Sequence, residues 1–89
     1  MILYHGTNNI NISPIIGGKM AKDTWLTSVK YHAFRVAERR SFQRGGAALV
    51  LEIETNNVKR VEGIDTPTYQ FNGGYYKVLA MHYMKRIEI

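Results

Sequence analysis

Four apolar residues in the middle of the chain recur at the spacing of one helix face: Val29, Ala33, Val36 and Ala37. Ser28 stands where it can cap this helix, and Gly45 stands where the helix can end. Arg40 falls on the same face, so its side chain must either extend to solvent or pair with another group. The pattern predicts one long amphipathic helix.

A second pattern, in which apolar and polar residues alternate, predicts strands. It is clearest from Ala47 to Glu54. Shorter segments bounded by glycine, proline or asparagine predict further strands at residues 2–5, 24–27, 58–61, 75–80 and 85–89. The segment from Gly63 to Asn72 contains Pro67 and is expected to be a loop. We therefore expect a single domain over residues 1–89, an α+β fold with a mixed sheet of about five short strands and one main helix.

Composition and charge limit the kinds of site, location and partner that we expect. The chain has 89 residues, a net charge of +5 and no cysteine. It therefore has no disulfides or thiolate zinc sites, and its histidines are not spaced like metal ligands, so we expect no metal. No apolar run is long enough to span a bilayer and no signal peptide follows Met1, so we expect a cytoplasmic protein without membrane contact. The positive charge favours nucleic acid, an acidic protein face or a phosphate-bearing cofactor, although it also serves solubility.

The tripeptide His5-Gly6-Thr7 at the end of the first predicted strand is the best candidate for chemistry. A glycine at this point leaves main-chain N–H and C=O groups open to a planar amide such as nicotinamide. The imidazole of His5 can meanwhile bind a ribose hydroxyl, and Thr7 adds a polar contact. The alternative is a simple turn that carries a surface histidine.

Five segments in order resemble the ADP-ribosyltransferase superfamily, which includes a poly-ADP-ribose polymerase-like branch and the RNA 2′-phosphotransferases. They are His5-Gly6-Thr7 after the first strand, Trp25-Leu26-Thr27-Ser28, the helix with Ala33 and Val36-Ala37, the glycine-led strand Gly45 to Ile53, and the closing segment Asn72 to Ile87. The resemblance runs through nearly the whole chain.

This resemblance implies a split β-sheet that binds NAD in an extended cleft. It implies that His5 holds the adenosine-side ribose, that Gly6 binds the nicotinamide amide, and that Trp25 lies near the nicotinamide ring. The other residues of the cofactor site would be Thr7, Thr27 and Ser28. The RNA 2′-phosphotransferase branch uses basic residues to hold a phosphate, a role open here to Arg35, Arg39, Arg40 and Arg44.

The chain departs from the family pattern at two places, so NAD binding and catalysis are treated as separate predictions. Val36 replaces an aromatic residue on the helix, and Gly73, Gly74 and Tyr75 stand where the transferase branch has a glutamate. The first hypothesis is an NAD-binding ADP-ribosyltransferase-like protein that modifies a host macromolecule, as a phage or mobile-element effector would. In it His5 is the catalytic residue, which positions NAD while nicotinamide leaves. The second is an inactive protein of this fold that binds and inhibits an acidic protein. The third is a nucleic-acid binder that uses Arg35 and Arg39.

Overall fold

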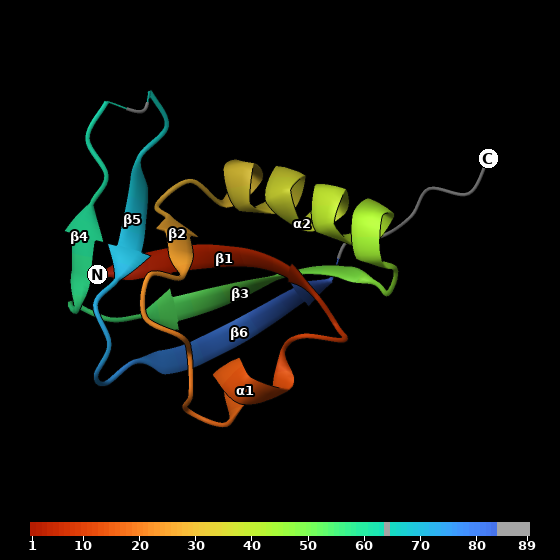
Figure 1. The fold of residues 1–89 in the computed structure, drawn as a ribbon, viewed down its shortest axis with the longest axis horizontal. Helices are drawn as coiled ribbons and strands as arrows, with labels where there is room; N and C mark the ends of the chain where they lie inside the picture. Colours follow the sequence, from red (N-terminus) through yellow and green to blue (C-terminus); the bar gives the residue numbers. More distant parts are fainter. Residues whose placement is uncertain (64, 84–89) are drawn as a thin grey trace.

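The computed structural model describes residues 1–63 and 65–83, which form six strands and two helices (Figure 1). In chain order these are β1 (Ile2–Asn8), α1 (Ser13–Ile16), β2 (Trp25–Thr27), α2 (Lys30–Arg44), β3 (Ala48–Glu54), β4 (Val58–Arg60), β5 (Thr68–Phe71) and β6 (Lys77–Tyr83). None of the helices in this part of the chain has the length and apolar character needed to cross a bilayer.

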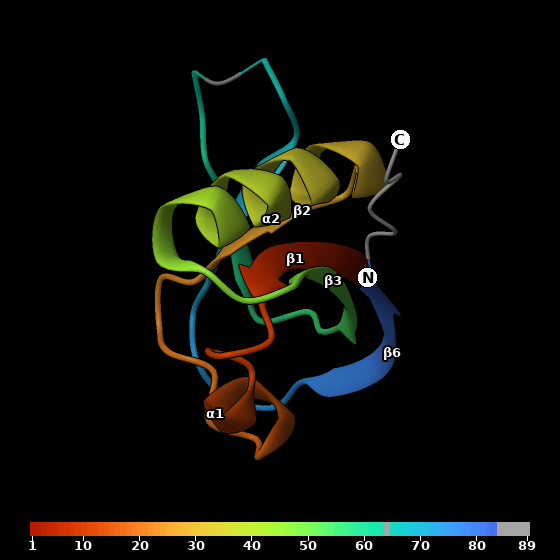
Figure 2. The same ribbon diagram turned by 90° about the vertical axis from the view of Figure 1, so that its right-hand side faces the viewer.

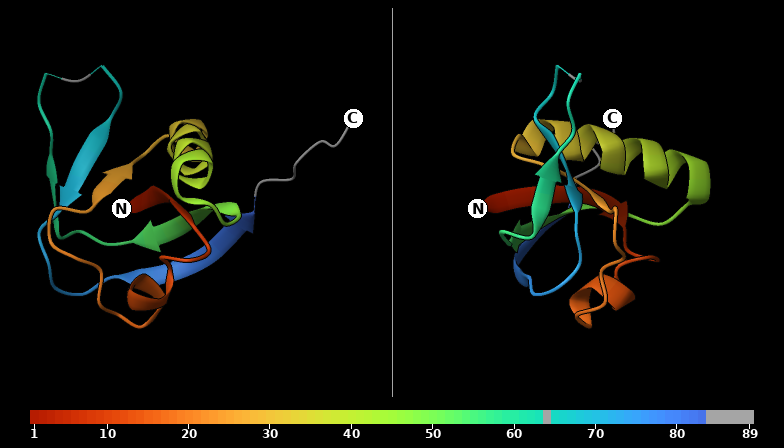
Figure 3. Two further views of the ribbon diagram at one scale, coloured as in Figure 1. Left: turned by 45° about the vertical axis from the view of Figure 1, so that its right-hand side comes forward. Right: turned by 60° about the vertical axis from the view of Figure 1, so that its left-hand side comes forward.

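The strands form one open sheet in the order β4-β5-β2-β1-β3-β6, and every neighbouring pair is antiparallel. The prediction of an α+β fold is confirmed, but the prediction of a split, mixed sheet with about five strands is wrong, because the six strands form one antiparallel sheet. Only β1–β2 and β4–β5 pair strands that are consecutive in the chain, and the other three pairs join separate segments, so local sequence signals did not reveal their direction. The sheet twists strongly, so β4 and β5 lie at a steep angle to β3 and β6 (Figure 3).

Helix α2 covers one face of the sheet, and α1 lies on the opposite side (Figure 2). Ala33 and Ala37 of α2 are buried against Val50 of β3. Gly6 of β1 allows this close packing, because a Cβ there would overlap the carbonyl oxygen of Ala33 and lie 2.8 Å from the main-chain nitrogen of Ala37. Packing of the helix is therefore a sufficient structural reason for glycine at position 6.

The larger core lies on the α1 side of the sheet. Its buried members are Leu3, Ile15, Met20, Leu26, Leu49, Leu51, Ile53, Phe71 and Tyr76. The alternation predicted for 47–54 is confirmed, since Leu49, Leu51 and Ile53 face this core. Val50 points the other way and is buried too, because α2 covers that face.

Four local predictions are wrong. The first strand does not end at His5, because Gly6 and Thr7 pair with Val50 and Leu49 of β3 and β1 continues to Asn8. Helix α2 begins after Val29, with no side-chain hydrogen bond from the N-cap, so Ser28 does not cap it. Val36 is 44% exposed and does not share the buried face of Ala33. Strand β5 occupies part of the segment expected to be a loop, because it pairs with both β2 and β4. The strand predicted at residues 85–89 lies outside the described residues.

Candidate functional site

Strands β1 and β2 diverge almost as soon as they meet. In the described chain their ladder has one Cα pair, Tyr4 opposite Thr27, whereas β1 and β3 pair along the whole length of β1. A side chain bridges the two strands beyond that pair, since Nδ1 of His5 lies 2.8 Å from the main-chain oxygen of Trp25. The divergence leaves space between β1, β2 and the helix that crosses them.

This space is a pocket of about 340 Å³, named here the His5 pocket. Its lining comes from β1, β2, α2 and the segment around β5: Tyr4, His5, Gly6, Trp25, Leu26, Thr27, His32, Ala33, Arg35, Val36, Arg39, Arg40, Thr66 and Thr68. The volume is in the range of ligand sites in proteins.

The bond between His5 and Trp25 determines how the imidazole can act. A carbonyl oxygen only accepts hydrogen bonds, so Nδ1 of His5 carries the hydrogen and donates it. Desolvation by burial lowers the pKa of His5, the nearby charge of Arg40 lowers it further, and the bond to Trp25 acts in the opposite direction. The neutral ring leaves Nε2 as a hydrogen-bond acceptor.

The charges that line the pocket are all positive. Arg35, Arg39 and Arg40 contribute guanidinium groups, and the lining residues include no aspartate or glutamate. Arg35 is held by Tyr31, whose hydroxyl oxygen lies 3.5 Å from Nη1 and whose ring centre lies 6.0 Å from the guanidinium carbon. Such a lining favours an anion with several oxygens, such as a phosphate.

Trp25 supplies the aromatic surface. It is 49% exposed and lines the pocket, so it is not a core tryptophan. Thr27 also lines the pocket, but its hydroxyl already donates to the carbonyl oxygen of Pro67 at 2.7 Å and accepts from the N–H of Val29 at 3.1 Å. Thr27 therefore joins the end of β2 to the approach of β5 and to the start of α2.

The structure brings together seven of the ten candidate site residues: His5, Gly6, Trp25, Thr27, Arg35, Arg39 and Arg40. The other three, Thr7, Ser28 and Arg44, lie outside the lining. Thr7 is buried, and Arg44 is at the far end of α2 from the first turn. A ligand role for these three stays a prediction.

One charged or polar pocket residue on α2, His32, was not assigned to this site from the sequence, although its spacing from the arginines contained the signal. Counted from His32, the residues Arg35, Val36, Arg39 and Arg40 lie three, four, seven and eight positions along the chain, which is one helix face. Because Arg35 and Arg39 both line the pocket, they are not simply an outward nucleic-acid-binding face.

Metal coordination has no basis in the described residues, which contain no group of three or more histidine, cysteine, aspartate or glutamate side chains arranged to hold an ion. Comparison of the chain with protein-family models, with curated proteins and with solved structures finds no match. The function therefore has to be inferred from the pocket itself.

Proposed function

We propose that the His5 pocket binds a nicotinamide dinucleotide, NAD, and that the chain is an ADP-ribosyltransferase-like protein. The observation that carries this proposal is the combination of groups in one pocket: an Nε2 acceptor on His5, an exposed Trp25 and three arginines in a lining that includes no acidic residue. A dinucleotide has ribose hydroxyls that donate, flat heterocycles that stack and a pyrophosphate that is anionic. Each part has a complementary group in the lining.

Within this proposal His5 accepts a hydrogen bond from a ribose hydroxyl through Nε2. Gly6 offers main-chain groups to the nicotinamide amide where β2 has diverged from β1. Trp25 contacts a ring, and Arg35 and Arg40 bind the pyrophosphate. The assignment of His5 and Gly6 to particular parts of NAD follows the sequence resemblance, and the assignment of the arginines follows their charge.

Binding and transfer are separate parts of the proposal. In the transferase branch a glutamate steadies the ribose while nicotinamide leaves, and the pocket lining has no carboxylate for this role. That observation favours the second candidate function, a protein that keeps the pocket and acts by binding an acidic partner. Transfer, if it occurs, would attach ADP-ribose to a macromolecule of the host.

A thermal-shift titration tests binding. A ligand that binds only the folded state at ten times its Kd adds about 1.4 kcal/mol to the free energy of unfolding. For a domain of this size the melting temperature should then rise by about 7 °C. His5→Ala and Arg40→Gln should each reduce the rise relative to their own melting temperatures, whereas Arg44→Gln should keep it. Absence of a shift at millimolar NAD would rule out the proposed pocket function.

Incubation with labelled NAD and a cell lysate then distinguishes the two candidate functions. Label in macromolecules that disappears with His5→Ala supports transfer. A clear thermal shift without any label in macromolecules supports the binding protein.

A further inference from the structure

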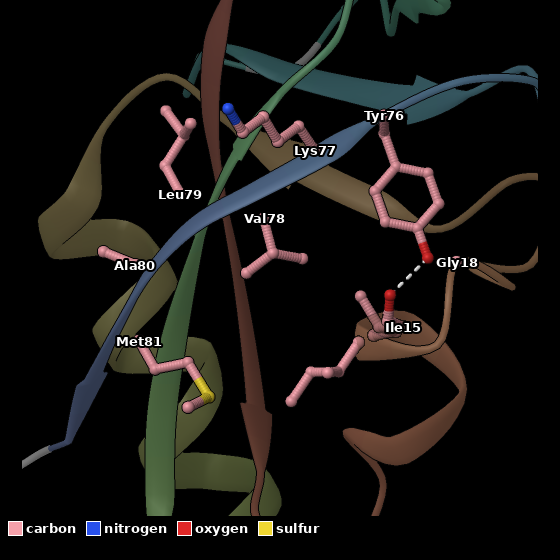
Figure 4. A pocket seen from close by; sticks show the side chains of 9 residues that line it. Ile15, Gly18, Tyr76, Lys77, Val78, Leu79, Ala80 and Met81 are labelled. Atoms are coloured by element: carbon pink, nitrogen blue, oxygen red, sulfur yellow. Dashed lines mark hydrogen bonds between the residues drawn. The ribbon is translucent and has the colours of Figure 1, made fainter.

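A second hollow lies between α1 and β6, and Figure 4 shows the side chains that line it. Figure 2 shows that α1 is on the opposite side of the sheet from α2. The hollow has a volume of about 460 Å³, and we name it the β6 groove. Its lining is mostly apolar: Ile15, Ile16, Gly18, Tyr76, Lys77, Val78, Leu79, Ala80 and Met81. It shares no lining residue with the His5 pocket, so it is a separate feature of the molecule.

Tyr76 holds the two walls of the groove in place. Its hydroxyl donates to the main-chain oxygen of Ile15 and accepts from the N–H of Met20 at 2.9 Å. Its ring packs edge-on against Phe71, with centroids 5.4 Å apart. These contacts are buried, so α1 is fixed relative to the start of β6 and the groove is formed in advance of any ligand.

Strand β6 is the last strand of the sheet, after β3. Among residues 1–63 and 65–83, no strand pairs with its outer edge. This edge also exposes apolar side chains, with Met81 45% and Tyr83 55% accessible. An open edge of main-chain donors and acceptors is complemented by another extended strand, which can place alternate side chains in the adjoining groove.

An irregularity in β6 limits where such a strand can align. The register with β3 shifts between Glu52 and Ile53, which leaves Leu79 as an extra residue in β6. In Figure 4, Val78 and Met81 point towards the α1 side while Leu79 and Ala80 point away from it. A bulge interrupts pairing, so the added strand should align with Ala80 to Tyr83 and place a side chain beside Met81.

Charge selects among the possible occupants. Lys77 is the charged residue among those that line the groove, and its side chain points away from α1, to the same side of β6 as Leu79 (Figure 4). The chain as a whole has a net charge of +5. A second copy of the chain would bring the same positive charge to the interface. A segment with carboxylates would be attracted to Lys77 and to the rest of the molecule.

We propose that the β6 groove binds an extended acidic peptide segment of another protein, which adds as a strand to β6 and inserts an apolar side chain between Met81 and Ile15. Main-chain hydrogen bonds to β6 hold the segment, and its carboxylates alternate onto the face away from α1, the side to which Lys77 points (Figure 4). The site is independent of NAD and of the His5 pocket.

Selection from a random peptide display library tests the proposal on the whole chain. Enriched peptides should alternate apolar residues with Asp or Glu. Their synthetic, fluorescently labelled forms should bind in anisotropy measurements, and amide NMR shifts should concentrate at residues 80–83. N-methylation of alternate peptide amides should abolish binding, because it removes the main-chain donors while keeping the side chains.

Two variants and their matched controls locate the site. Lys77→Glu should weaken binding about fivefold, because an exposed ion pair is replaced by a repulsion. Met81→Glu should abolish it. Lys59→Glu on β4 and Phe42→Glu, at a residue 91% exposed on α2, make the same charge changes elsewhere and should leave affinity unchanged. All four positions are exposed, so folding should persist, as circular dichroism can verify.

Any of four results would overturn the proposal: no enrichment, enrichment of basic peptides, binding that is unaffected by Met81→Glu, or full affinity after N-methylation. Sedimentation analysis adds a further decisive outcome. A wild-type dimer that becomes monomeric with Met81→Glu would mean that a second copy of this chain, and not an acidic peptide, occupies the edge.

Discussion

Nδ1 of His5 lies 2.8 Å from the main-chain oxygen of Trp25, and this bond joins β1 to β2 at the point where their ladder has already stopped. The bond has two consequences. It fixes the imidazole as the Nδ1–H tautomer, which leaves Nε2 to accept a hydrogen bond from a ligand. It also places a side chain, and not a ladder of main-chain bonds, between the two strands that border the pocket.

The tautomer and the protonation of His5 can be measured directly by ¹⁵N NMR. We expect the neutral Nδ1–H form at neutral pH and a pKa below 6.5, because burial disfavours the charged ring and Arg40 adds repulsion. Arg40→Gln removes that repulsion and should raise the pKa of His5. Arg44→Gln is the control, since Arg44 lies outside the pocket lining. Detection of the Nε2–H tautomer would contradict the assigned hydrogen bond.

The lowered pKa of His5 predicts how stability depends on pH. Between the folded-state pKa and the ordinary value of 6.5, the unfolded chain binds the proton more readily than the folded chain does. The stability linked to His5 is therefore fully present above pH 6.5 and is lost as the pH falls through the folded-state pKa. The free energy of unfolding, measured with urea at several pH values in this range, should change less steeply with pH in His5→Gln than in the wild type. An equal dependence on pH in the two proteins would exclude this linkage.

Gly6→Ala tests the packing of α2 on β1. The new Cβ would overlap the carbonyl oxygen of Ala33, a main-chain atom that no side-chain rotation can move away. We expect a loss of about 3 kcal/mol in the free energy of unfolding. Gly17→Ala is the control, because Gly17 has an ordinary φ of −76° and its Cβ would lie 3.2 Å from the oxygen of Ser13. Chemical denaturation compares the two, and similar stabilities would refute the close approach.

Tyr76→Phe removes one hydroxyl and leaves the ring. The N–H of Met20 then loses its partner inside the core, and the oxygen of Ile15 keeps the N–H of Gly18 but loses the stronger donor. Since unpaired buried groups are costly, we expect a loss of about 1–2 kcal/mol in the free energy of unfolding. Tyr75→Phe is a matched control at the neighbouring residue, which is 78% exposed. Loss of a hydroxyl there should leave the denaturation midpoint unchanged.

Periodicity in the sequence was sufficient to locate the main helix and the central strand. The helix ends at Gly45 and the strand occupies residues 48–54, close to the predicted bounds. Both have strong local signals, an apolar stripe in one and alternation in the other. Strand β5 was missed because Pro67 and the neighbouring polar residues indicated a loop, whereas pairing with β2 and β4 makes residues 68–71 extended.

For the candidate site, the sequence by itself was sufficient to select His5-Gly6-Thr7 and the arginines of one helix as candidates. It also determined the positive net charge. Only the tertiary structure decided which of these residues meet. Divergence of β1 from β2 opened the space, and the crossing of α2 brought Arg40 to His5 while Arg44 lies outside the lining. The position of α2 also gives Gly6 a packing role against Ala33. These relationships depend on contacts between segments far apart in the chain, which no local spacing encodes.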